Sequence, residues 1–173
     1  MEVKKQSSQG SPATKPVLTQ TENNTTLWIG HSQSDPTDHL AGQTFTCPGS
    51  GILNNIQLYS ASVNIPGELL LTLHEFDERS KSWGRPLCEA RQTLGRGDDG
   101  HWIRFALEPV QLQKGATYGF KIQSPDAMIG LGEAAHHARA PFSFGHAWNG
   151  SSNNKTGHFF DFFSLAFKIE VCA

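Results

Sequence analysis

Charged residues are scarce in this chain of 173 residues. Lys, Arg, Asp and Glu make up 17% of the sequence, and the formal net charge is −2. The Lys and Arg residues are scattered and form no basic patch that could neutralise a row of phosphates, so we expect no nucleic-acid partner. No stretch approaches the ~20 consecutive apolar residues of a membrane span, and we expect no insertion into a membrane.

Cysteine is also sparse. Cys47, Cys88 and Cys172 are too few and too far apart for a cysteine-based zinc site or a CxxC redox motif. Their simplest interpretation is small apolar side chains, and one disulfide with a leftover thiol is the alternative in an exported protein. No apolar run follows Lys4 and Lys5, so the sequence as given predicts no signal peptide and, by default, a cytoplasmic location.

Turn-forming residues, in contrast, are plentiful, with 17 Gly and 9 Pro. Between the turns, apolar residues recur with a period of two, which is typical of strands, and no helical period lasts three turns. Only 133–139 favours a helical turn. About eight strands, spaced roughly 8–12 residues apart, predict an all-β fold: an antiparallel β-sandwich of the jelly-roll type.

The expected strands include 43–46, 52–60, 68–76, 87–94, 102–107, 117–123 and 163–171. Residues 128–158 break this spacing, and we interpret them as one long loop, a kind of segment that is usually functional or mobile. Residues 1–26 are polar and contain few apolar side chains, so we expect a flexible tail or linker there. The β-sandwich domain is then expected to span 27–173.

The order of several motifs resembles that of a known group of modules. These motifs are GQTFT (42–46), GILNNIQLY (51–59), PGEL (66–69) and SLAFKI (164–169). The chain resembles, over most of 27–172, the jelly-roll accessory modules that bacteria attach to surface proteins and polysaccharide-degrading enzymes, including carbohydrate-binding modules. The resemblance implies export from the cell and a carbohydrate ligand.

The acidic residues in turns could bind a structural calcium ion. Many modules of the resembled group have an acidic residue at the start of the final strand, near such an ion. This sequence has Ser164 at the matching position, and Asp161 lies three residues earlier. Carboxylates that could hold calcium, or simply stabilise turns, are Asp35, Asp38, Asp98, Asp99 and Asp161.

Eight histidines are present, and several fall in or beside the expected loop. A zinc-type site needs three or four converging ligands, and the candidates are His136, His137, His158 and Asp161. Their spacing matches no metal-binding motif, so surface histidines are the alternative. The sequence also contains no nucleophile elbow, no Cys–His nucleophile context and no phosphate-binding glycine loop that opens a helix. We therefore expect neither catalysis nor a cofactor.

Aromatic and polar residues mix in 141–150 (PFSFGHAWNG). Rigid aromatic rings stack on the apolar face of a sugar while neighbouring polar groups bind its hydroxyls. The candidate ligand-binding residues are Trp148, His146, Phe144 and Asn149, with Trp83 from the polar hairpin loop expected at 77–85. The alternative is that these aromatic residues pack the loop onto the sandwich.

These observations favour a non-catalytic binding module that recognises carbohydrate through aromatic residues in loops. A structural or protein-interaction β-sandwich, active in self-assembly or adhesion, is the first alternative. A His-rich metal-dependent enzyme is the second. The expected partner is therefore a carbohydrate or another protein.

Overall fold

The computed structural model describes residues 13–173, which form fourteen β-strands and one short 3-10 turn, η1 (Arg96–Asp98). None of the described residues forms a helix of the length and apolarity that a membrane crossing needs. The strands are β1 (Thr14–Gln20), β2 (Thr25–Ser32), β3 (Asp35–Thr46), β4 (Gly51–Ile65), β5 (Gly67–Asp77), β6 (Ser82–Leu94), β7 (His101–Ala106), β8 (Gln111–Leu112), β9 (Thr117–Gln123), β10 (Met128–Ala135), β11 (Ala147–Ser151), β12 (Asn154–Phe160), β13 (Phe163–Leu165) and β14 (Phe167–Cys172).

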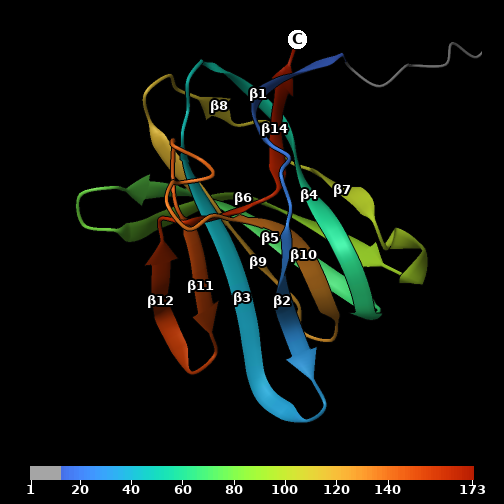
Figure 1. The fold of residues 1–173 in the computed structure, drawn as a ribbon. Helices are drawn as coiled ribbons and strands as arrows, with labels where there is room; N and C mark the ends of the chain where they lie inside the picture. The colour runs from blue at the N-terminus through green and yellow to red at the C-terminus, as the bar shows by residue number, and fades with distance from the viewer. Residues whose placement is uncertain (1–12) are drawn as a thin grey trace, which may run out of the picture.

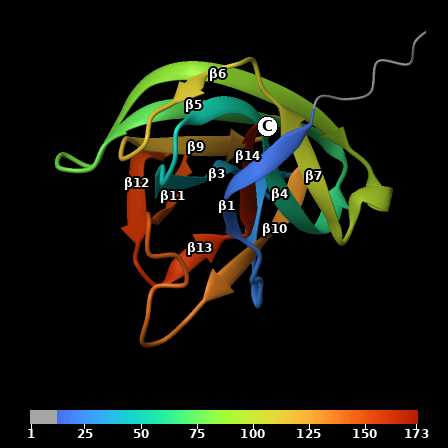
Figure 2. The same ribbon diagram turned by 90° about the horizontal axis from the view of Figure 1, so that it is seen from above.

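Antiparallel pairing joins the strands into a sheet with the order β1-β14-β4-β10-β2-β3-β9-β5-β6 (Figure 1). The β11–β12 hairpin attaches to β3, β7 and β8 attach to β4, and β13 attaches to β10. The sheet is strongly curved (Figure 2). Phe120 of β9 and Phe167 of β14 therefore meet inside the molecule, with ring centroids 5.7 Å apart.

Strict alternation along the strands supplies the core. Leu69, Leu71 and Leu73 of β5 face inward and are almost completely buried, as are Phe120 and Ile122 of β9. Removing such side chains from water is the main driving force for folding. Alternation also means that the intervening residues of β5 and β9 face outward, where a binding site can form.

The all-β prediction is confirmed, but the number of strands is not about eight. The strand expected at 117–123 is β9 with the same bounds. The final expected strand divides at Ala166 into β13 and β14, and Phe163 is 37% exposed instead of facing the core. Several missed strands pair over only a few residues, and such short strands carry too little alternation to be seen in the sequence.

The expected long loop at 128–158 is wrong, because it contains β10, β11 and β12. β10 lies between β4 and β2 in the sheet and is covered on both faces, so its sequence MIGLGEAA shows no polar alternation. The helical turn expected at 133–139 is also wrong. Glu133 belongs to β10 and is paired with Leu165 of β13.

The expected tail is partly folded. β1 pairs with β14 along the edge of the sheet, and its Leu18 is 8% exposed, so the folded part begins before residue 27. An edge strand gains backbone hydrogen bonds from its neighbour and can be held with few buried side chains. Residues 1–12 of the expected tail lie outside the described residues.

The three cysteines are free thiols. Cys47 and Cys88 are buried, in agreement with their interpretation as small apolar side chains, and Cys172 is half-buried. Burial raises the pKa of the Cys47 thiol and raises that of Cys88 to about 11. Both buried thiols are therefore protonated and unreactive at neutral pH.

Candidate functional site

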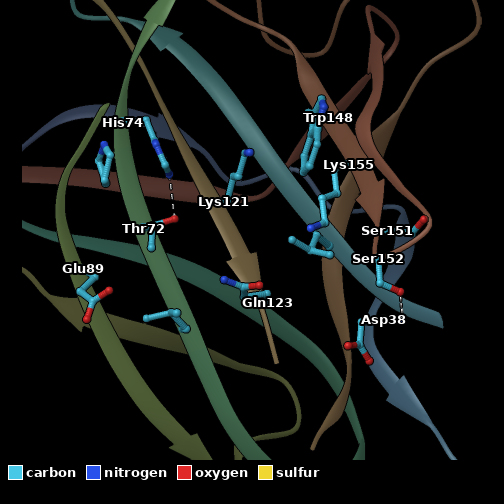
Figure 3. Close-up of a pocket in the computed structure, with 13 residues that line it drawn as sticks. Asp38, Thr72, His74, Glu89, Lys121, Gln123, Trp148, Ser151, Ser152 and Lys155 are labelled. Atoms are coloured by element: carbon cyan, nitrogen blue, oxygen red, sulfur yellow. Dashed lines mark hydrogen bonds between the residues drawn. The ribbon is translucent and has the colours of Figure 1, made fainter. Parts of the chain in front are cut away.

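A cleft of about 570 Å³ lies on the outer face of the sheet, between β6 and the β11–β12 hairpin (Figure 3). Side chains from β3, β5, β6, β9, β11 and β12 and from the turn between β11 and β12 line it. They are Asp38, Leu40, Leu70, Thr72, His74, Pro86, Glu89, Lys121, Gln123, Trp148, Ser151, Ser152 and Lys155.

Strand register builds the floor of this cleft. Thr72 of β5 is paired with Glu89 of β6 on one side and with Lys121 of β9 on the other. Because neighbouring strands are about 4.8 Å apart, these three side chains form a short row across the sheet. Leu70 and Gln123 are paired in the adjacent row and add an apolar and an amide group.

The β11–β12 hairpin forms the opposite wall and is fixed to β3. Ser151 is paired with His39, and the Ser152 backbone N–H donates to the Asp38 carbonyl at 2.9 Å. The Asp38 N–H donates in turn to the Ser152 hydroxyl at 3.0 Å. Asn153 adds a hydrogen bond from its Nδ2 to the Thr37 hydroxyl at 2.9 Å. These bonds hold the wall at a defined distance from the floor.

Trp148 closes one end of the cleft but is only 1% exposed. Its Nε1–H donates to the Thr156 carbonyl at 3.0 Å, and its ring meets that of Trp83 edge-on at 5.4 Å. The ring also lies against Gly42, where an added Cβ would come within 3.1 Å of Trp148 Cε3. Trp148 therefore shapes the cleft but does not present an open ring face for stacking.

Lys121 sits at the centre of the floor beside two indole rings. Its Nζ lies 4.7 Å from the ring centroid of Trp83 and 4.8 Å from that of Trp148, which is cation–π geometry. Partial burial lowers the pKa of the Lys121 ammonium, because the charged form loses hydration. In the part of the chain that the structure describes, no carboxylate lies within ion-pair distance of this group.

His74 contributes a neutral group to the cleft. Its Nδ1 is 3.1 Å from the Gly84 carbonyl, which can only accept, so we assign the ring proton to Nδ1. Nε2 then accepts from the Thr72 hydroxyl at 2.9 Å. Burial lowers the pKa of His74, the nearby Lys121 lowers it further, and the bond to Gly84 opposes both effects. The imidazole is thus held uncharged.

The other predicted ligand-binding residues lie outside the cleft lining. Phe144 is 51% exposed. His146 lies between two carboxylates, with Nε2 3.1 Å from Glu78 and Nδ1 2.9 Å from Asp161. Asn149 of β11 is half-buried. Trp83 of β6 is also half-buried, and its ring contacts that of Trp148. The structure thus brings Trp83 and Trp148 together and leaves Phe144 and His146 apart from them.

The predicted metal ligands do not converge. His136 contacts Glu22 at 2.9 Å, His158 contacts Asn154 at 3.4 Å, and Asp161 contacts His146. Within residues 13–173, no group of three or more His, Cys, Asp or Glu side chains is arranged to hold a metal ion. Acidic residues considered for calcium instead bind nearby groups, as Asp35 binds the Thr37 N–H and Asp98 the Gly95 N–H.

The polar floor of the cleft was not predicted from the sequence. Thr72, Lys121 and Gln123 occupy the outward positions of well-predicted strands, and such positions usually form a solvated face. The alternation indicated that they face outward. Only the register between β5 and β9, together with the position of the hairpin, shows that they gather in one cleft.

No protein-family model matches the chain, and no curated protein matches it. Among solved structures, the chain is similar to a clostridial cysteine protease, Cwp84, in its form after propeptide cleavage. The TM-score is 0.57 at 10% sequence identity. The match covers 92% of this chain and 40% of that protein's chain, so it spans less than half of the larger structure. At this identity the likeness concerns the fold alone.

Proposed function

We propose that this protein is a non-catalytic binding module that holds a saccharide in the cleft beside the β11–β12 hairpin. The observation that carries the proposal is the composition of the cleft. Leu40 and Leu70 provide apolar surface within reach of hydroxyl, amide and charged groups, among them Ser151 and Gln123. A sugar ring needs this combination, because it presents C–H groups on its faces and hydroxyls at its edge.

The fold is compatible with this proposal. The likeness to part of a clostridial protein concerns an all-β architecture, and the order of motifs resembles that of bacterial carbohydrate-binding modules of the jelly-roll type. We extend the proposal to this jelly-roll relationship and to export, since a module for polysaccharides would meet its ligand outside the cell. Fold analogy supports the proposal less strongly than the cleft does.

The experiment is a glycan array followed by isothermal titration calorimetry on the best ligand. We expect saturable binding, and we expect Gln123→Ala, which removes an amide from the cleft floor, to weaken it about 5- to 10-fold. Gln113→Ala is the matched control, because Gln113 is exposed and lies outside the cleft lining. The absence of saccharide binding, or equal losses for the two variants, would contradict the proposal.

A second candidate function is assembly through an exposed sheet face. Trp28 of β2 is 45% exposed, and its ring lies close to Gly130 of β10, where an added Cβ would be 3.3 Å from Trp28 Cη2. A broad ring lying over a glycine creates a flat apolar surface that suits a protein partner. Light scattering tests this candidate: a stable oligomer that Trp28→Ser dissociates would favour assembly over saccharide capture.

A further inference from the structure

The cleft contains two ammonium groups, those of Lys121 and Lys155. Lys121 projects from the floor and Lys155 from the hairpin wall, and Figure 3 shows both in the part of the cleft beside Trp148. Within residues 13–173, neither forms an ion pair or a side-chain hydrogen bond to a carboxylate. On the outer strands β5 and β6, by contrast, Arg91 is paired with Glu68 at 2.7 Å and Arg85 with Glu75 at 3.5 Å.

The two acidic groups of the cleft, Asp38 and Glu89, lie away from this pair of cations (Figure 3). The carboxylate of Asp38 is engaged by His31, whose Nδ1 lies 2.7 Å from Asp38 Oδ1. Glu89 belongs to the outer strand β6, and the register places Thr72 between it and Lys121. His74 is held as a neutral ring. Figure 3 shows Asp38 at the end of the cleft far from Trp148 and Glu89 at the β6 side, so the ammonium groups of Lys121 and Lys155 share the end beside Trp148.

Burial removes part of the hydration of the Lys121 ammonium, and no carboxylate among residues 13–173 forms an ion pair with it. The ammonium faces two indole rings, which attract a cation but accept no strong hydrogen bond. An anion entering the cleft would restore the lost electrostatic stabilisation, and a charge-assisted bond is stronger in a partly enclosed site than on an open surface. A neutral sugar would offer only hydroxyl groups for this purpose.

From this arrangement we infer that the saccharide is anionic, with its carboxylate or sulfate placed between Lys121 and Lys155. This inference rests on the proposed function and specifies the class of ligand. The neutral part of the sugar would then lie over Leu40 and Leu70, and its hydroxyls would meet Gln123 and Ser151.

Calorimetry with paired ligands tests the inference. One pair is trigalacturonate and its methyl ester, which have the same sugar skeleton with and without the charge. The second pair is a sulfated galactan oligosaccharide and its desulfated form. We expect the charged member of one pair to bind about 10-fold more tightly or better, and its affinity to fall as NaCl is raised, because salt screens the attraction. The pair with the larger ratio identifies the charged group.

Variants then locate the charge. Lys121→Met and Lys155→Met should each weaken binding of the anionic ligand about 5- to 20-fold, whereas Lys121→Arg, which keeps the charge, should retain most of the affinity. Lys168→Met is the matched control, because Lys168 also lies over an indole, 4.1 Å from the Trp102 ring, but outside the cleft. Thermal melts of each variant show that loss of binding is not loss of folding.

The two proposals fail in different ways. Equal affinity for the charged and neutral members of both pairs would overturn the anionic ligand and leave saccharide binding intact. Binding of anions that Lys121→Met and Lys155→Met leave unchanged would also overturn it, since the charge would then act elsewhere. No binding by any member of either pair, together with an empty glycan array, would overturn both proposals.

Discussion

At the scale of single residues, Glu133 shows how the fold tolerates an ionisable group inside its core. Glu133 follows Ile129 and Leu131 on the inward face of β10 and is 6% exposed. Burial raises the pKa of its carboxyl group from 4.5 to about 7. The folded protein therefore binds this proton more tightly than the unfolded chain does. The resulting stability is present below about pH 4.5 and is lost as the pH rises through about 7.

Replacing this carboxyl should remove the pH dependence. Between pH 5 and pH 8, we expect the free energy of unfolding of the wild type to fall more than that of Glu133→Gln. The difference between the two decreases should be on the order of 1–2 kcal/mol, after allowance for partial hydration of the carboxyl group. Urea unfolding at several pH values measures this difference. Glu108→Gln is the control, because Glu108 is exposed. Parallel pH profiles for the wild type and Glu133→Gln would contradict the assignment.

Gly42 allows Trp148 to pack against the sheet. An added Cβ would lie 2.9 Å from the Phe120 carbonyl oxygen and 3.1 Å from Trp148 Cε3, both closer than normal contacts. We expect Gly42→Ala to destabilise the protein by about 1–3 kcal/mol and to shift the tryptophan fluorescence. Gly97→Ala, where a Cβ would meet nothing within 4 Å, should be close to neutral. Equal effects of the two substitutions would argue against this packing.

Individual site residues were only partly predictable. The aromatic content of 141–150 indicated Trp148, and its ring does form one end of the cleft. Its burial agrees with the alternative that these aromatic residues pack onto the sandwich. The contacts with Gly42 in β3 and Gly157 in β12, which leave room for the indole, could not be predicted. Lys121 could not be selected from the sequence, because a single outward lysine on a strand has the same pattern as any solvated position.

At the scale of elements, β1 completes one edge of the sheet. Leu18 is its buried apolar side chain and packs into the main core. We expect Leu18→Ala to lower the free energy of unfolding by about 2–4 kcal/mol, through lost burial and the cavity left behind. Thr19→Ala, at the next and exposed position of the strand, should change it by less than about 0.5 kcal/mol. A Leu18→Ala variant as stable as Thr19→Ala would show that β1 contributes little to the fold.

The strands that the sequence predicted well are those with one buried and one exposed face. Apolar and polar residues alternate clearly in β5 and β9. β9 has the expected bounds, and β5 extends one residue beyond the expected range at each end. β10 was not predicted because both of its faces are covered. β1 was not predicted because Leu18 is its single buried apolar side chain. Local patterns report the contrast between two faces of a strand, and that contrast is absent in these two elements.

At the scale of the whole molecule, the cleft results from strand pairing between distant parts of the chain. Its lining comes from positions as distant in sequence as Asp38 and Lys155, which antiparallel pairing through β3 and β11 brings together. Composition and turn spacing predicted an all-β protein, but they contain no information on which strands become neighbours. The order β3-β9-β5-β6, and hence the cleft, follows from long-range pairing that no local pattern specifies.

Anionic saccharide binding in this cleft can be tested directly by a two-dimensional NMR titration of the protein with an anionic oligosaccharide. We expect saturable shifts of the backbone signals around Thr72, Lys121, Gln123 and Ser151, and no shifts around Trp28 and Trp102. Shifts confined to the Trp28 face, or no shifts at saturating ligand, would contradict the claim that this cleft is the binding site.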